Sequence, residues 1–221
     1  MSSQTAPPPG RQRRATRATR ARILEAARRE LGRNPDSSLG DIAEAAGVAR
    51  RTVYTHFAGR AALVEGLADE VAEAVRLAMA ATGAPRTDPA SALARFVLTL
   101  WPVGECYRTL IGLAGQDLSP DQVREVLAPA RETAAGILAE GRRRGVFHTV
   151  VPPCALSSAI EAHLLSLLAA VNSGIWADDG TRAAIAALIA AGVDGDTATA
   201  TVRRLRDTER PHSPDRARRA D

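Results

Sequence analysis

Two short helical patterns that meet at a glycine constrain this chain more than any other feature of its sequence. The first pattern follows Ser38, a residue that can cap a helix, and carries Ile42 inward before Gly47 ends it. The second pattern covers residues 50–57. Two helices joined by a short turn that contains glycine form a helix-turn-helix unit, whose second helix enters the major groove of DNA. The spacing predicts such a unit here.

The second helix of this unit carries polar side chains on its outer positions. Such groups can reach base edges and phosphates. The residues expected to do so are Arg50, Arg51, Thr52, Thr55 and His56. Phe57 is expected in the core. Tyr54 is either simply half-exposed or, as we favour, places its hydroxyl on a phosphate.

The net charge of +4 is unevenly distributed along the chain. Residues 1–60 contain 12 arginines and 5 acids, residues 61–200 contain 10 arginines and 16 acids, and residues 201–221 contain 7 arginines and 4 acids. A basic module joined to an acidic body confines polyanion binding to one end of the chain. Charge alone leaves DNA, RNA and an anionic membrane open as partners.

Helical periodicity continues through the rest of the sequence, without a convincing alternating strand, so we expect an all-α fold. Pro102 is expected to separate two helices, because proline is poorly tolerated inside one. The expected helices cover residues 19–33, 39–46, 50–57, 59–81, 89–101, 103–115, 120–144, 152–173, 180–191 and 196–207. Residues 1–16 are expected as a disordered basic arm and residues 208–221 as a disordered arginine-rich tail.

A membrane span and a secretory signal are not expected. The longest nearly unbroken apolar stretch, residues 183–193, is shorter than the roughly 18 residues that a span needs, and residues 1–20 lack an apolar core. Cys106 and Cys154 are far apart and form no metal or disulfide pattern. We therefore expect no metal, no cofactor and a cytoplasmic location.

An enzyme is also not expected. Cys154, His163 and Glu161 could be imagined as a nucleophile, a base and an orienting group. No nucleophile elbow, phosphate loop or metal spacing accompanies them. Cys154 follows two prolines and is most simply a small apolar residue at the start of a helix.

Several stretches of the amino-terminal segment resemble a known family. They are ILEAA at residues 23–27, DIAEAAGV at residues 41–48, TVYTHF at residues 52–57, and residues 60–63. On these motifs residues 17–65 resemble the amino-terminal, three-helix DNA-binding domain of the TetR family of bacterial transcriptional regulators. The resemblance implies an all-helical homodimer that binds a palindromic operator as a repressor. It also implies that the carboxy-terminal domain, residues 66–207 here, binds a small-molecule effector that releases the DNA.

The resemblance assigns roles within the reading helix. Arg50, Arg51 and Thr52 match the positions at which the family meets bases and backbone. Tyr54 and His56 match its phosphate-contacting aromatic residue and histidine. Double-stranded DNA is therefore the expected nucleic acid.

Two residues outside the reading helix complete the expected DNA-binding set. They are Ser38 and Arg60, of which Arg60 replaces a common lysine and keeps a positive charge near a phosphate. Gly40 departs from the family, because this position often holds a long polar side chain. The loss could be offset by an arm that enters the minor groove, although this arm could equally be a solvated tail. Its arginines are Arg11, Arg13, Arg14 and Arg17.

The carboxy-terminal half is expected to supply the dimer and the effector pocket. By resemblance, the helices near residues 152–173 and 180–191 form the dimer interface, with an ordinary intrachain core as the alternative. Polar and aromatic residues among the intervening helices could line a mostly apolar cavity. The candidate pocket residues are Phe96, Trp101, Cys106, Tyr107, Gln116, Phe147 and His163.

Two rival functions stay open on the sequence alone. The first is a DNA-binding regulator without a small-molecule effector, controlled by a protein partner. The second is an enzyme with a vestigial DNA-binding head. Activation rather than repression is open as well, because the sign depends on where the operator lies.

Overall fold

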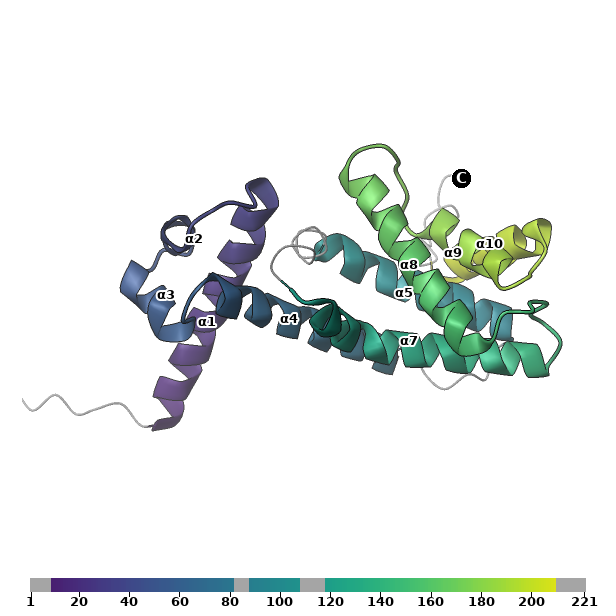
Figure 1. The fold of residues 1–221 in the computed structure, drawn as a ribbon, viewed down its shortest axis with the longest axis horizontal. Coiled ribbons are helices and arrows are strands. Elements are labelled where there is room, and N and C mark those ends of the chain that lie inside the picture. The colour runs from purple at the N-terminus through teal and green to yellow at the C-terminus, as the bar shows by residue number, and fades with distance from the viewer. Residues whose placement is uncertain (1–8, 82–87, 108–117, 210–221) are drawn as a thin grey trace, which may run out of the picture. The chain divides into compact units, whose positions relative to one another are not determined.

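The computed structural model describes residues 9–81, 88–107 and 118–209 of the chain (Figure 1). These residues form nine helices and contain no strand, which confirms the expected all-helical fold class. The helices are α1 (Pro9–Arg33), α2 (Leu39–Ala45), α3 (Arg50–His56), α4 (Arg60–Ala81), α5 (Pro89–Cys106), α7 (Pro120–Arg143), α8 (Pro153–Asn172), α9 (Thr181–Ala190) and α10 (Gly195–Glu209).

The chain divides into two compact units. The first comprises residues 1–74 and 106–127, and the second comprises residues 75–105 and 128–221. One boundary lies inside α4, and the division that the sequence suggested lies inside the same helix. The first unit therefore includes a segment from the carboxy-terminal half of the chain.

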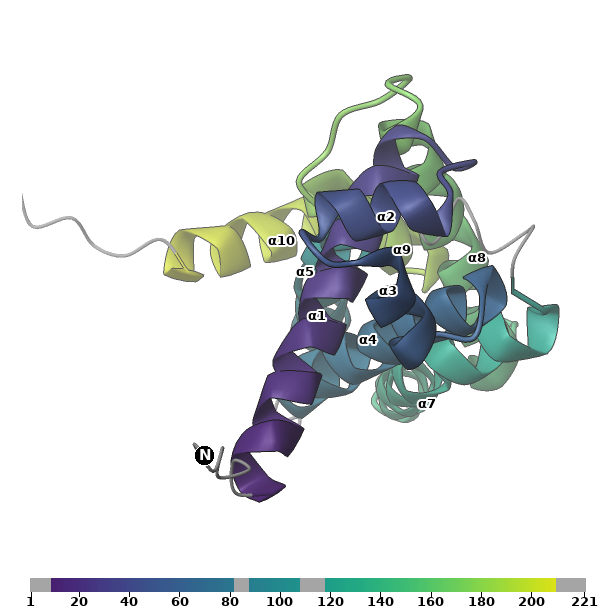
Figure 2. The same cartoon turned by 90° about the vertical axis from the view of Figure 1, so that its left-hand side faces the viewer.

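The core of the first unit is built by α1 to α4 (Figure 2). Its buried side chains are Ile23, Leu24, Ala27, Leu31, Ile42, Ala43, Val53, Phe57, Leu63, Val64, Leu67 and Ala68. Removing these apolar groups from water supplies the main stabilisation of the unit. Leu118 and Val126 pack against the same cluster, so the returning segment contributes to this core.

Helix α1 begins at Pro9 rather than at Thr19, so the expectation of a disordered arm through residue 16 is wrong from Pro9 onward. Apolar periodicity could not reveal these turns, because residues 13–18 are all exposed. Their composition still favours a helix: proline is accepted in a first turn, and arginine and alanine have high helix propensity. Residues 1–8 and the tail from residue 210 lie outside the described part of the chain.

Helix α5 continues through Pro102 to Cys106, so the break expected at Pro102 is wrong. Proline removes one hydrogen bond from a helix, but tertiary packing holds α5 on both sides of it. Trp101 is buried, and a Cβ atom on Gly104 would lie only 2.5 Å from Cδ1 of Leu168. Pro102 itself is exposed. Packing against α8 therefore outweighs the lost hydrogen bond.

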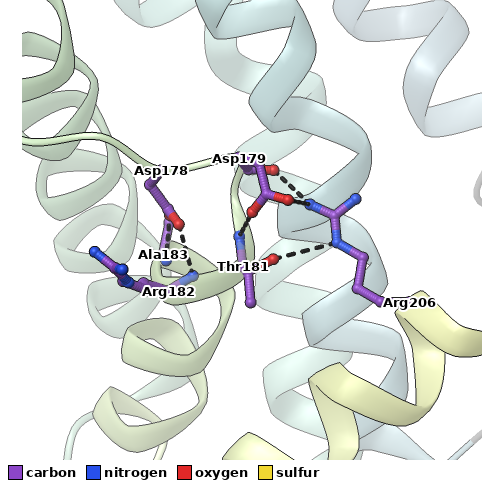
Figure 3. Close-up of polar contacts among 6 residues, drawn as sticks. All are labelled: Asp178, Asp179, Thr181, Arg182, Ala183 and Arg206. Atoms are coloured by element: carbon purple, nitrogen blue, oxygen red, sulfur yellow. Dashed lines mark hydrogen bonds and ion pairs between the residues drawn. The ribbon is translucent and has the colours of Figure 1, made fainter.

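In the second unit, Arg206 of α10 holds the start of α9 (Figure 3). Its Nη2 donates to the carbonyl oxygen of Asp179 and lies 3.2 Å from the Asp179 carboxylate, while its Nε donates to Oγ1 of Thr181. The hydrogen bond from Thr181 is the largest cause that holds the pKa of Asp179 below its usual value. Asp178 accepts two backbone N–H groups of the first turn of α9, at 3.1 and 2.9 Å. These carboxylates satisfy donors that a helix start leaves unpaired.

A glycine and two tryptophans fix the segment that leads into α9. Gly180 has a φ of +91°, a left-handed conformation that favours glycine. A Cβ atom at this position would lie 2.8 Å from Cγ of Trp101. Trp176 meets the same indole edge-on, with ring centroids 6.3 Å apart. The segment before α9 thus lies directly on α5.

Helix α8 is apolar on two opposite faces. Its inner face buries Leu156, Ile160 and Leu168. Its outer face is a narrow stripe of small residues, all exposed: Ala155, Ala159, Ala162, Ser166 and Ala169. By length and composition alone α8 is long and apolar enough to cross a membrane, and most of it is not buried within the described part of the chain. A helix that is apolar on more than one face requires a second apolar partner.

Candidate DNA-binding surface

The start of α2 is fixed by a reciprocal cap. The backbone N–H of Asp41 donates to Oγ of Ser38 at 3.2 Å, and the backbone N–H of Ser38 donates to the Asp41 carboxylate at 2.8 Å. This is the capping box of a helix start. The hydrogen bond from the Ser38 backbone is the largest cause that lowers the pKa of Asp41. The expected role of Ser38 as a helix cap is confirmed.

The turn between α2 and α3 depends on a glycine and on an arginine from another helix. Gly47 has a φ of +62°, which confirms it as the turn residue. Nη2 of Arg22 in α1 donates to the carbonyl oxygens of Ala46 and Gly47, at 3.1 and 3.4 Å. These carbonyls follow a helix end, where acceptors lack partners within the helix. Arg22 thus positions the turn, a role that its distance in sequence concealed.

Helix α3 buries one side and exposes the other. Val53 and the following Phe57 lie in the core, as expected. Arg50, Arg51, Tyr54 and Thr55 are exposed, and Thr52 and His56 are half-buried. The structure thus places four of the expected reading residues on one short exposed surface, which we call the α3 face. They are Arg50, Arg51, Tyr54 and Thr55.

Contacts within the α3 face orient its side chains. The guanidinium carbon of Arg50 lies 5.9 Å from the centroid of the Tyr54 ring, within the range of a cation–π interaction. Arg50 also contributes, as a minor cause, to the lowered pKa of Asp41. Oγ1 of Thr55 donates to the carbonyl oxygen of Arg51 at 2.9 Å. No ion pair is recorded for Arg50 or Arg51 within the described residues, so both cations are available to an anion.

Arg60 braces the loop that precedes α2. Its Nη1 donates to the carbonyl oxygen of Ser37 at 3.3 Å, and its Nη2 donates to the carbonyl oxygen of Pro35 at 2.8 Å. The phosphate contact expected of Arg60 stays a prediction. The hydrogen bonds of Arg60 to the loop before α2 are a structural role that the sequence did not predict.

The candidate pocket residues are divided between the two compact units. Cys106 and Tyr107 belong to the first unit, whereas Phe96, Trp101, Phe147 and His163 belong to the second. Gln116 lies outside the described residues.

Within the second unit these residues differ in environment. Phe147 is buried against Gly141, and His163 is exposed on α8. Trp101 is buried, and its Nε1 has no hydrogen-bond partner among the described residues. A buried donor without an acceptor is energetically unfavourable. Among the pocket candidates, Trp101 is therefore the one whose N–H group could donate a hydrogen bond to an acceptor on a ligand.

The three residues considered for catalysis do not form a hydrogen-bonded set. Both carboxylate oxygens of Glu161 accept from Arg131, at 2.9 and 3.0 Å. Cys154 and His163 are exposed. Glu161 therefore ties α8 to α7 rather than orienting a base. No group of three or more metal-ligating side chains is found in the part of the chain that the structure describes.

The fold and the α3 face define a class of protein: an all-helical chain with a helix-turn-helix unit near its amino terminus. Residues 23–67 match the family model of the bacterial regulatory proteins, tetR family. The helix-turn-helix part of the chain is therefore similar to the amino-terminal domain of that family.

Curated regulators match a part of the chain. The HTH-type transcriptional regulator TtgR of Pseudomonas putida is 37% identical over 86 residues, which cover 38% of this chain and 41% of TtgR. The HTH-type transcriptional repressor LfrR of Mycolicibacterium smegmatis is 40% identical over 77 residues, covering 35% of this chain and 38% of LfrR. The matches thus span about two-fifths of the length of these relatives.

Solved structures share the fold over most of the chain. A gamma-butyrolactone receptor (ArpA-like protein) has a TM-score of 0.68 at 18% identity and covers 88% of this chain and 99% of its own. LfrR from Mycobacterium smegmatis in complex with proflavine has a TM-score of 0.63 at 23% identity and covers 82% and 97%. RolR in complex with resorcinol has a TM-score of 0.54 at 22% identity and covers 86% and 96%. At these sequence identities, the similarity shows a shared fold and nothing more.

Proposed function

We propose that the chain is a DNA-binding transcriptional repressor that binds a palindromic operator as a dimer and is released by a small-molecule effector. One observation carries the proposal: the α3 face presents two arginines, a tyrosine and a threonine on the second helix of a helix-turn-helix. An arginine fork can bind the O6 and N7 atoms of guanine, and hydroxyl groups can bind phosphates. A regulator of this kind acts in the cytoplasm.

The outer face of α8 supports a dimer. Its stripe of small residues allows another helix to approach closely, and neighbouring α9 adds Ile189, which is 50% exposed. A second copy of this chain is the partner that would cover both helices under two-fold symmetry. Dimerisation of α8 and α9 also accounts for an apolar helix that is largely unburied within its own chain. In that dimer, two α3 helices spaced by about 34 Å or somewhat more would face successive major grooves.

A small-molecule effector is supported by two kinds of observation. LfrR and RolR were solved with proflavine and with resorcinol, both small aromatic compounds. In this chain, the buried Nε1 of Trp101 lacks an acceptor among the described residues. An effector that offers an acceptor to this N–H would bind the second unit. Contact by Phe96, Phe147 or the other pocket candidates is part of the same proposal.

Fluorescence anisotropy tests the proposal. Purified protein is titrated against labelled DNA that flanks its own gene, with scrambled duplex as competitor and with salt varied. We expect binding that survives the competitor, with two protomers per site and an affinity that falls steeply with salt as counterions are released. The same complex then serves to screen aromatic compounds for release.

Three outcomes would contradict parts of this proposal. Weak binding that responds to salt alone, on every duplex offered, would remove the sequence-specific regulator. Binding of one protomer per site would contradict the proposed dimer but not the proposed DNA binding by the helix-turn-helix. Release by no compound, together with a filled core around Trp101, would favour the rival regulator that a protein partner controls.

A further inference from the structure

The amino-terminal turns of α1 extend beyond the core of the first unit. From Arg13 on, where the exposure of α1 is described, its first buried residue is Ile23, whereas the helix begins at Pro9. At 1.5 Å per residue, the turns before Ile23 measure about 21 Å. Both views of the molecule show this part of α1 extending past α2 and α3 (Figures 1 and 2). Residues 13–22, whose exposure the structure describes, contribute no buried side chain to the core, so core packing does not explain these turns.

Three arginines continue the inward face of α1 through these turns. Arg13, Arg17 and Arg20 are spaced by four and three residues, and the same spacing leads on to the buried Leu24 and Ala27. Residues at these intervals lie on one side of a helix. The face that packs the core in the carboxy-terminal half of α1 is therefore a row of cations in its amino-terminal half. We call this row, Arg13, Arg17 and Arg20, the α1 ridge.

The α1 ridge starts beside the reading helix. The guanidinium carbon of Arg20 lies 5.2 Å from the ring centroid of Phe57, the residue that directly follows α3. Arg17 and Arg13 follow one and two turns further out, about 4.5 and 10.5 Å along the helix axis. The ridge thus begins near the carboxy-terminal end of α3 and runs outward along α1.

Among the described residues, carboxylates are found near only one arginine of the ridge, Arg20, which faces Asp69 and Glu70. The sequence has no acidic residue before Glu25, and Arg20 lies 4.0 Å from Asp69 in the one ion pair recorded for the ridge among the described residues. Arg13 and Arg17 are exposed and have no recorded partner there. Two exposed cations one helical turn apart suit a partner with a row of negative charges, which the duplex backbone supplies.

We propose that Arg13 and Arg17 bind backbone phosphates that flank the half-site contacted by the α3 face, with α1 remaining helical. This inference rests on the proposed function. A helix with its side chains is about 10–12 Å wide, whereas the minor groove of B-DNA is about 6 Å wide. The helical turns cannot enter the minor groove as an extended arm would. Phosphate contacts add affinity without sequence preference, so the ridge lengthens the DNA footprint and leaves the recognised bases unchanged.

The salt dependence of DNA binding tests the ridge. The double variant Arg13→Ala/Arg17→Ala is compared with wild type on the duplex that flanks the gene. Four phosphates, two per protomer of a dimer, correspond to a slope of log K against log salt that is about 3.6 units shallower in the variant. The charge-matched control is Arg29→Ala/Arg203→Ala, since both arginines are exposed and Arg29 lies on the opposite side of α1. The control is expected to change the slope by less than half as much.

A hydroxyl-radical footprint locates the contact. Wild type is expected to protect sugars outside the palindrome, and the double variant is expected to lose only this outer protection. Arg13→Lys/Arg17→Lys keeps the charge and should restore most of the slope. An unchanged slope and footprint in the alanine variant would overturn the proposal. So would an outer contact that disappears when flanking A·T pairs are replaced by G·C, because that pattern indicates minor-groove reading.

The failure of the proposed function would be distinguishable from the failure of this inference. If wild type discriminates no duplex from scrambled DNA, the regulator proposal fails. The salt slope can then be measured on a scrambled duplex, where phosphate contacts persist. There, a shallower slope in the double variant supports the ridge, and an equal slope overturns it.

Discussion

Arg28 and Cys106 are joined by two hydrogen bonds from one nitrogen. Nη1 of Arg28 donates to the carbonyl oxygen of Cys106 at 3.1 Å and to its Sγ at 3.2 Å. Nε and Nη2 of the same guanidinium donate to Glu25, and this interaction is the largest cause that raises the pKa of Arg28. The guanidinium carbon of Arg28 lies 6.0 Å from the centroid of the Tyr107 ring. Arg28 thereby ties the end of α5 to α1 within the first unit.

Arg28→Ala is expected to lower the free energy of unfolding by about 1 kcal/mol, because the Cys106 carbonyl and Glu25 lose a charged donor. Arg28→Lys should recover only part of this loss, since an ammonium group cannot make the same forked set of contacts. Urea unfolding measures both. Arg29→Ala removes an exposed arginine from the same helix and serves as the control. Equal stability of the two alanine variants would show that the contacts to Cys106 contribute nothing.

Glu70→Gln is expected to stabilise the protein at neutral pH. Burial is the largest cause that raises the pKa of Glu70, with Arg20 and Arg28 opposing it. The folded state therefore binds the proton more tightly than the unfolded state does. Stability then falls as pH rises from the unfolded pKa through the raised folded pKa, and the penalty persists above it.

Thermal unfolding across this pH range checks the prediction. The Tm advantage of the glutamine variant should be largest near pH 7 and should shrink as the pH approaches 4.5, the ordinary pKa of the carboxyl. Glu65→Gln, an exposed substitution on the same helix, is the matched control. A Tm advantage that does not vary with pH would mean that burial of the charge is not its cause.

Ile189→Asp is expected to yield a monomer. In the proposed dimer, this substitution would bury an unpaired carboxylate between two copies, at a cost far above that of an exposed charge. Sedimentation velocity measures the change, and DNA affinity should fall with it because only one head then binds. Leu77→Asp places the same charge on another exposed apolar residue, which is 55% exposed on α4. If both variants stay dimeric, α9 does not contribute to the interface.

Arg50→Ala and Arg51→Ala separate base contacts from phosphate contacts. Loss of an arginine that binds guanine should cost about 1–3 kcal/mol and relax the preference at one base pair. Loss of a phosphate contact should weaken all sequences alike. Tyr54→Phe removes only a hydroxyl and is expected to weaken every site equally. If the phenylalanine variant binds every site with unchanged affinity, a phosphate contact by Tyr54 is excluded. Titration of single-base variants of the operator distinguishes base contacts from phosphate contacts for all three residues.

The helix-turn-helix was predictable because its requirements are local. Ser38 caps α2 through a residue three positions away, and Gly47 adopts the positive φ that its turn needs. Val53 and Phe57 follow the helical period and are buried accordingly. In each case the interacting groups are close in sequence, so residue type and spacing carry the information.

Features that depend on distant contacts were not predictable in this way. Pro102 indicated a helix end, but packing of Gly104 against Leu168 keeps α5 continuous. Arg22 and Arg60 read as two more basic residues, whereas their hydrogen bonds to loop carbonyls join segments more than twenty residues apart. Nothing in the sequence near either arginine identifies these acceptors.

Helix α4 has a consequence for building chimeric regulators. The first compact unit ends within this helix, and it also takes in residues 106–127, of which Leu118 and Val126 pack on its core. A head transplanted by a single cut after residue 74 would leave both of these side chains behind, together with Cys106, the partner of Arg28. A working transplant would therefore require two pieces of this chain, with one junction set in helical register inside α4.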